Sequence, residues 1–256
     1  MHPADTLAKL DAAYFSPHMF LGGPGSAGVL LFDRAPYHNR VPDNPGGGTV
    51  DWTSPWGHKY VDDIELREDG GTPGFLQAIR AALSVALKEA MGTETMLERE
   101  HQLLARLFRG LGEVPGLCVL ANHVHERLGI VSFYIDGLHY NLLVKYLSDR
   151  YGIQVRGGCS CAGTYGHYLL HVDRDTSSRL TGMIERGDQS EKPGWVRVSV
   201  HPTVTDDEVD FITGSIREAV QTTGRWSQDY EYNVRTNEWH HVREGSPRDL
   251  AGWFRV

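Results

Sequence analysis

Two long segments of the chain carry apolar residues at helical spacing. The first lies within residues 70–92, and its apolar positions are Phe75, Ile79, Leu83 and Leu87. This spacing predicts a helix with one apolar face, capped by Thr72, with Pro73 in its first turn and Gly92 at its end. A second helix is predicted over residues 93–112, with apolar positions at Leu104, Leu107, Phe108 and Leu111.

Short apolar runs predict strands on both sides of these helices. The segments 11–15 and 27–32 flank the turn "LGGPGS". Residues 33–60, rich in Pro, Gly, Asn and Trp, are expected to form a long ordered loop. From residue 115 the pattern predicts strands at 117–122, 130–136, 153–158 and 195–200, a helix at 140–152 ending at Gly152, and a closing hairpin at 229–242. Thr205 and Glu208 form a capping box that predicts a helix over 205–220.

These elements predict a fold in two parts. Residues 1–114 are interpreted as α/β material, and residues 115–256 as a smaller α+β domain with a mixed or antiparallel sheet. The N-terminal part has few strands for a parallel-sheet domain, which needs several strand–crossover–strand units. It is therefore expected to be an incomplete domain, whereas the C-terminal part is expected to be whole.

Composition narrows the classes of function. The 256-residue chain has a formal net charge of −8, which argues against nonspecific nucleic-acid binding. No apolar run is long enough to cross a bilayer, and the N-terminal segment lacks the features of a signal peptide. Three cysteines, an odd and small number, suggest a reducing compartment, so we expect a cytoplasmic protein without membrane association.

The segment "SPHMFLGGPG" is the first candidate for chemistry. The hydroxyl of Ser16, the imidazole of His18 and the amides of the following turn are groups that can hold a phosphate. The alternative is a Gly/Pro turn between two strands with an incidental histidine. Thr72, at the predicted helix N-terminus, is a further anion-binding candidate, although simple N-capping explains it equally well.

A second candidate is the glycine-rich segment "VRGGCSCAGTYGH". Cys159 and Cys161 follow a predicted strand, which is a suitable place for a reactive thiol. Cys159, Cys161, His167 and His171 also form a C-x-C-x5-H-x3-H pattern that could bind zinc, although one residue between the cysteines is tighter than usual. The remaining reading is two inert residues packed in a loop.

Arg197 is the third candidate. It lies in the middle of the apolar strand "WVRVSV", where a guanidinium needs a carboxylate or phosphate partner. A salt bridge within the domain is the ordinary explanation, and binding of an anionic ligand is the functional one.

Taken together, these segments resemble the class V aminotransferase family of fold-type-I, pyridoxal-phosphate (PLP) enzymes, and are most similar to cysteine desulfurases and selenocysteine lyases. The resemblance rests on five segments in order: "SPHMFLGGPGSAGVLLF", "GGGTVDW", "EDGGTP", "RGGCSCAG" and "WVRVSVHPTVTDDEVDFI". It implies that residues 1–114 are the C-terminal part of the PLP-binding large domain, with a parallel-type sheet and helices.

The resemblance also implies roles for individual residues. Ser16 and His18 would bind the PLP phosphate, and Thr72 would reach the phosphate of a partner subunit, so a homodimer is implied. Arg197 would hold the α-carboxylate of an amino-acid substrate. Cys161 would be the thiolate that takes sulfur from the substrate as a persulfide, and Cys159 and Ser160 replace a His pair often found before it.

The sequence departs from the family at the cofactor lysine. The family pattern is Ser-x-His-Lys, whose lysine binds PLP covalently, and Met19 stands at that position. A thioether cannot form a Schiff base, so PLP is expected without covalent attachment. No match was found for the residues that hold the pyridine ring. Lys59 in "WGHKY" lies outside the strand–turn context and is interpreted as an ordinary lysine.

Three hypotheses follow. The first is a PLP-dependent, cysteine-desulfurase-like protein acting on an amino acid, inactive as this chain alone, with no metal required. The second is a catalytically dead assembly or binding subunit that pairs with an intact homologue. The third is a zinc-binding module built on the four Cys and His residues named above.

Overall fold

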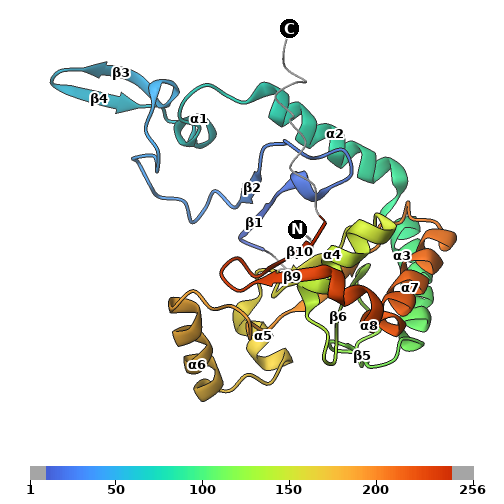
Figure 1. Cartoon of the computed structure of the whole chain (residues 1–256). Helices are drawn as coiled ribbons and strands as arrows, with labels where there is room; N and C mark the ends of the chain where they lie inside the picture. The colour runs from blue at the N-terminus through green and yellow to red at the C-terminus, as the bar shows by residue number, and fades with distance from the viewer. Residues whose placement is uncertain (1–9, 244–256) are drawn as a thin grey trace, which may run out of the picture. The chain divides into compact units, whose positions relative to one another are not determined.

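The computed structural model describes residues 10–243 (Figure 1). The chain divides into two compact units between Thr93 and Glu94. The predicted domain boundary lies between residues 114 and 115, whereas the two units meet between Thr93 and Glu94. The predicted helix over 93–112 therefore packs with the C-terminal unit. The division into functional domains stays a prediction.

The N-terminal unit contains small antiparallel sheets and helices. Its elements are β1 (Ala12–Phe15), the short helix Pro17–Met19, β2 (Val29–Phe32), the short helix Gly47–Thr49, β3 (Val50–Ser54), β4 (Gly57–Tyr60), α1 (Ile64–Glu68) and α2 (Phe75–Met91). β1 pairs with β2, and β3 pairs with β4, each in an antiparallel two-stranded sheet. Every strand pair among residues 10–243 is antiparallel, so the parallel sheet implied by the resemblance is not part of the described structure.

Two predictions in this unit were wrong. The segment 33–60 is not all loop, because residues 50–60 form the β3–β4 hairpin around Pro55. Helix α2 begins at Phe75 with Gly74 as its N-cap and has no capping hydrogen bond from a side chain, so Thr72 does not cap it. Gly92 ends the helix as predicted, with a φ of 77° that favours glycine.

The C-terminal unit is built around a four-stranded sheet. Its elements are α3 (Thr93–Gly112), β5 (Leu117–Val119), β6 (Ile130–Ile135), α4 (Tyr140–Tyr151), β7 (Arg156–Gly158), α5 (Gly163–Leu169), α6 (Arg174–Glu185), β8 (Trp195–Ser199), α7 (Asp206–Gln221), α8 (Thr223–Trp226), the short helix Ser227–Asp229, β9 (Tyr230–Asn233) and β10 (Glu238–His241). The strand order is β5-β6-β8-β7, with every neighbour antiparallel, and β9 and β10 form the predicted closing hairpin. Helices α5 and α6 were not predicted.

The hydrophobic core of the chain lies in this C-terminal unit. Phe133 and Val131 of β6, Leu107 of α3 and Ile216 of α7 are all completely buried. The predicted capping box is present at the start of α7, where Thr205 and Glu208 bond to each other's backbone amides. Val196 and Val198 of β8 belong to this core, which anchors the strand that pairs with β7.

Membrane-spanning helices were searched for among the described residues. No helix there is both long and apolar enough to cross a bilayer.

Candidate functional site

The predicted phosphate-binding segment forms a tight turn in the N-terminal unit. Pro17–Met19 is one turn of 3-10 helix in which the Met19 amide donates to the carbonyl of Ser16 at 3.1 Å. The chain then turns back, and a Cβ atom on Gly23 would collide with the carbonyl oxygen of Pro17. Glycine at this position therefore permits the close approach of the two backbone segments.

The donors of this turn fit an anionic group. The Gly25 amide donates to Nδ1 of His18 at 3.1 Å, so Nε2 carries the proton of the neutral ring and can donate outward. Ser16, two residues before His18, is also exposed. These groups suit a phosphate, but Met19 does not suit covalent PLP attachment, because its side chain is a thioether. The turn therefore offers an anion site without covalent attachment of PLP.

Thr72 and Lys59 belong to the same unit. Thr72 is exposed and lies before the first turn of α2. Lys59 lies on β4, and its ammonium contacts the Asp51 carboxylate of β3 at 2.9 Å. That hydrogen bond raises the pKa of Lys59, which keeps it an ordinary charged lysine.

Cys161 lies in a tight turn after β7 in the C-terminal unit. The Ala162 amide donates to the carbonyl of Cys159 at 2.8 Å, and the two residues between them have positive φ angles, 51° at Ser160 and 65° at Cys161. This is the pattern of a type I′ turn. Side-chain-bearing residues rarely adopt such angles, and each costs about 1–3 kcal/mol that the surrounding fold must supply.

The thiol of Cys161 is exposed and contacts a cation. Nη2 of Arg156 lies 3.1 Å from its Sγ and donates to it. The Cys161 sulfur is therefore accessible and accepts from a cationic donor. Sequence reasoning missed Arg156, although "VRGGCSC" places an arginine five residues before the cysteine.

Arg156 and Arg197 lie directly opposite each other on β7 and β8. Opposed residues of antiparallel strands project to the same face of the sheet, so two positive charges lie side by side. The Nε atom of Arg197 is buried and has no hydrogen-bond partner among the described residues. A guanidinium whose Nε has no partner among the described residues, beside a second guanidinium, is a suitable receptor for a carboxylate or phosphate.

The zinc pattern has no ligand set in the described structure. The ring of His167 is engaged at both nitrogens, with the Gly163 carbonyl at 2.8 Å and the Ser177 hydroxyl at 2.9 Å. Among residues 10–243, no group of three or more His, Cys, Asp or Glu side chains is placed to hold a metal ion.

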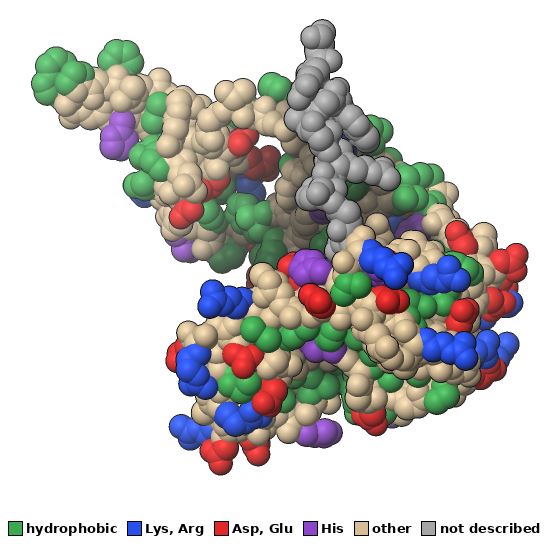
Figure 2. All heavy atoms as spheres, viewed as in Figure 1, with side chains coloured by type: hydrophobic (Ala, Val, Ile, Leu, Met, Phe, Trp, Pro, Cys, Tyr) green, Lys and Arg blue, Asp and Glu red, His purple; other side chains and the backbone are tan. Residues whose placement is uncertain are grey.

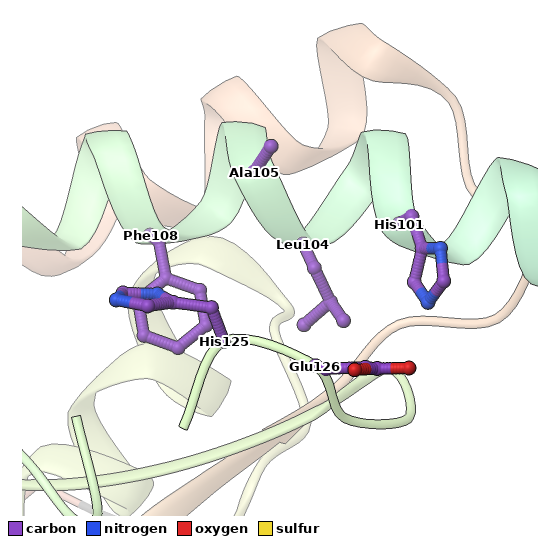
Figure 3. A pocket seen from close by; sticks show the side chains of 6 residues that line it. All are labelled: His101, Leu104, Ala105, Phe108, His125 and Glu126. Carbon is purple, nitrogen blue, oxygen red and sulfur yellow. The ribbon is translucent and has the colours of Figure 1, made fainter. Parts of the chain in front are cut away.

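A separate pocket of about 320 Å³ lies between α3 and the loop before β6. Figure 3 shows Leu104 and His101 pointing from α3 toward the loop that carries His125 and Glu126. The His125 ring meets the Phe108 ring edge-on, with centroids 5.5 Å apart. None of the sequence-predicted site residues lines this pocket.

The site residues therefore form two groups, one in each unit. Ser16, His18 and Met19 share the N-terminal turn. In the C-terminal unit, Arg156 at the start of β7 contacts Cys161 and pairs with Arg197 of β8. The first group offers hydrogen-bond donors for an anion. The second offers a thiol in contact with Arg156, which lies opposite Arg197 on the neighbouring strand.

Sequence comparison identifies the family. Residues 3–212 match the class-V aminotransferase family, to which the chain therefore belongs. A probable cysteine desulfurase of Staphylococcus epidermidis is 28% identical over 163 residues, which are 63% of this chain and 39% of that protein. Probable cysteine desulfurase 2 of Mycobacterium leprae is 30% identical over 154 residues, which are 60% of this chain and 36% of that protein.

Solved structures give the same fold. The apo cysteine desulfurase of Thermococcus onnurineus NA1 is 27% identical with a TM-score of 0.63, over 82% of this chain and 47% of that one. The cysteine desulfurase CsdA of Escherichia coli is 21% identical with a TM-score of 0.64, over 83% of this chain and 46% of that one, a similarity of fold alone. The chain thus spans less than half the length of these relatives, and its structure is consistent with part of the α/β fold of type I PLP enzymes.

Proposed function

We propose that the chain is a cysteine-desulfurase-like protein that takes up sulfur as a persulfide on Cys161. The observation that carries this proposal is the exposed Cys161 thiol held 3.1 Å from the guanidinium of Arg156. A persulfide-accepting cysteine must be accessible, and the exposure of Cys161 supports this condition. The adjacent Arg156 guanidinium can stabilise negative charge on the sulfur during the transfer.

The substrate in this proposal is an amino acid bound through its carboxylate. Arg197, whose Nε has no partner among the described residues, is the candidate for the α-carboxylate. Ser16 and His18 are the candidates for the phosphate of PLP, and Thr72 for the phosphate of a partner subunit in a homodimer.

Met19 limits what the chain can do alone. We expect no alanine release from cysteine by the purified chain, because no lysine stands at the position that binds PLP covalently in the family. Sulfur would then reach Cys161 from a persulfide donor rather than from turnover at this chain's own PLP site.

The experiment is a trapping test with a rescue variant. The purified chain and Met19→Lys are incubated with PLP, reduced with borohydride and examined by intact mass and peptide mapping. We expect no pyridoxyl adduct on the parent chain and an adduct at residue 19 of the variant. A stoichiometric adduct on Lys59 or another lysine of the parent chain, or alanine release by the parent chain, would contradict the proposed site.

A second candidate function is that of an assembly subunit pairing with an intact homologue. It is favoured by the apolar face of α2, where Phe75 is 68% and Leu83 is 64% exposed. Co-expression with an intact class-V homologue tests it. A mixed dimer that is lost in Leu83→Glu but kept in Gln77→Glu, an exposed polar position on the same helix, supports this role. A monomeric parent chain in that co-expression contradicts it.

A further inference from the structure

The turn after β7 contains a second cysteine that the proposed function does not use. Cys159 is the first residue of the turn and Cys161 is the third, and the turn is closed by the hydrogen bond from the Ala162 amide to the Cys159 carbonyl. Two thiols therefore lie on one tight turn, with only Ser160 between them.

The two thiols have different surroundings. Cys161 is exposed beside Arg156, whereas Cys159 is half-buried and donates from its Sγ to the carbonyl oxygen of Pro193 at 3.2 Å. Burial raises the pKa of Cys159, and the nearby Lys192 ammonium acts in the opposite direction. An exposed thiol next to a cation and a shielded thiol close by are the usual arrangement of an attacking and a resolving cysteine.

The backbone brings the two residues within reach of each other. In helical conformations of either hand, Cα atoms two residues apart are about 5.5 Å from each other, as helix geometry requires. The positive φ of Ser160 and the closing hydrogen bond place this turn in that class. Disulfides join Cα atoms about 4.4–6.8 Å apart, so the backbone spacing suits a Cys159–Cys161 bond. Side chains two residues apart in such a backbone do not face each other, so the bond also requires the turn to open and the Cys159 thiol to leave the Pro193 carbonyl.

Packing around Cys159 shields its sulfur in the resting turn. A Cβ atom on Gly166 of α5 would lie 3.6 Å from the Cys159 Sγ and 3.1 Å from the Trp195 ring. Glycine at 166 thus lets α5 approach the sulfur and the buried indole closely. In the resting turn this thiol is shielded between α5 and the segment before β8.

We propose that Cys159 is the resolving thiol for a persulfide on Cys161, so that the turn releases the accepted sulfur as hydrosulfide. This inference rests on the proposed function of Cys161 as a sulfur acceptor. The Cys159 thiolate attacks Sγ of the Cys161 persulfide, a Cys159–Cys161 disulfide forms, and the bond between Sγ and the outer sulfur breaks. The outer sulfur leaves as hydrosulfide with the electron pair of that bond, and the two cysteines are oxidised.

A further cycle needs a reductant of the dithiol class, which returns the disulfide to two thiols. A disulfide across one intervening residue closes a small ring on a backbone with two positive φ angles. Strained and accessible disulfides are easily reduced, so the turn is suited to repeated opening.

The test uses the full chain, reduced and freed of small thiols, with glutathione persulfide as the sulfur donor. The parent chain is compared with Cys159→Ser, Cys161→Ser and, as a matched control, Cys118→Ser on β5. Serine at 159 keeps a donor for the Pro193 carbonyl, so the turn is preserved, and circular dichroism checks the fold. Intact mass, peptide mapping and a sulfide assay are the readouts.

The parent chain and Cys118→Ser are expected to release one sulfide per chain and to lose the mass of two hydrogen atoms, mapped to a Cys159–Cys161 disulfide. Cys159→Ser is expected to gain the mass of one sulfur atom at Cys161 and to release sulfide at least about tenfold more slowly, because its resolving thiolate is missing.

Two other outcomes would contradict the resolving role of Cys159, and the second would also contradict the sulfur-accepting role of Cys161. If the parent chain and Cys159→Ser both keep a stable persulfide on Cys161, the resolving role is wrong while sulfur uptake stands. If neither chain gains sulfur at Cys161, and both give the same masses and the same sulfide release as Cys161→Ser, the proposed function of Cys161 is wrong as well.

Discussion

Helices α2 and α3 have similar amphipathic patterns, but the apolar face of α3 is buried and that of α2 is exposed. Leu103, Leu104, Leu107 and Leu111 of α3 are at most 3% exposed, whereas Phe75, Leu76, Ile79 and Leu83 of α2 are at least 55% exposed. The same contrast holds for the two units. Among the described residues of the N-terminal unit, Ala81 is the one aliphatic or aromatic side chain, prolines apart, that is buried. A periodic pattern identifies the face that favours burial, but a neighbouring element decides whether burial occurs.

Polar contacts hold the N-terminal unit where apolar packing does not. Arg67 of α1 is buried and donates to the carbonyls of Val61 at 2.8 Å, Asp62 at 3.0 Å and Asn39 at 3.2 Å. Apolar side chains instead gather at the surface. Figure 2 shows hydrophobic side chains at the outer end of the β3–β4 hairpin, whose turn exposes Trp56 at 93%. The free energy of unfolding is therefore expected to be larger for the C-terminal unit.

The largest effect is expected from a core substitution in α3. Leu107→Ala removes a completely buried side chain and should lower the free energy of unfolding by about 2–5 kcal/mol. Leu83→Ala on α2 is the matched control and should change it by less than about 0.5 kcal/mol, because Leu83 is exposed. Urea titrations followed by circular dichroism measure both. Equal losses would mean that the α2 face is covered in solution.

A smaller effect is expected from Arg67 in the N-terminal unit. Arg67→Ala leaves three carbonyl groups without their charged donor and should destabilise this unit by about 1–3 kcal/mol. Hydrogen exchange of the amides in β3, β4 and α1 measures it. Arg34→Ala is the control, since that exposed side chain makes a 3.8 Å contact with Asp63 and should change little. Unchanged exchange in Arg67→Ala would mean that other contacts hold the unit.

The two helix N-termini give a third comparison. Thr205→Ala removes the side-chain cap of α7 and should cost about 1 kcal/mol of stability. Thr72→Ala should leave stability unchanged, because Thr72 makes no cap for α2. Thermal unfolding of the two variants distinguishes them, and a loss in Thr72→Ala would contradict the start of α2 at Phe75.

The smallest effect concerns acid sensitivity, which we place in the C-terminal unit. Burial lowers the pKa of His139, and an interaction with Asn237 opposes this shift. Its Nδ1 accepts from the Asn141 amide and from Nε1 of Trp239, each at 3.2 Å, so the ring is held neutral. The unfolded chain binds more protons than the folded one between the lowered pKa and about 6.5.

This contribution to stability is therefore complete above pH about 6.5 and is lost as the pH falls through the lowered pKa. His139→Asn keeps an N-cap acceptor but does not titrate, so it should remove this part of the pH dependence. Urea midpoints at several pH values between neutral and mildly acidic measure it. A pH profile that is the same in the variant would place the acid sensitivity elsewhere.

The elements that the sequence predicted well depend on nearby residues. The α7 capping box, the end of α2 at Gly92 and the closing hairpin each follow from residues a few positions apart. The β3–β4 hairpin was missed because its turn, "SPWG", lies in a segment rich in loop-forming residues. The Thr72 cap was wrong because Pro73 and Gly74 delay the first helical turn.

The site was predicted only in part for the same reason. Cys161 and Arg197 were proposed from the order of segments and stay predictions. Arg156 was not proposed, because its contact with Cys161 depends on a turn that folds this cysteine back toward β7. Arg156 lies opposite Arg197 because of the register between β7 and β8. The sequence of either strand alone does not determine that register. Contacts made across a turn or between strands come from the assembled sheet, so local patterns do not reveal them.

The sheet that carries Arg156 also limits how chains can join. Both of its outer strands, β5 and β7, are three residues long, so each edge offers few unpaired backbone amides and carbonyls. Short edges discourage the addition of a strand from another molecule, a common route to aggregation. Association at this sheet would therefore have to use side-chain surfaces rather than backbone pairing.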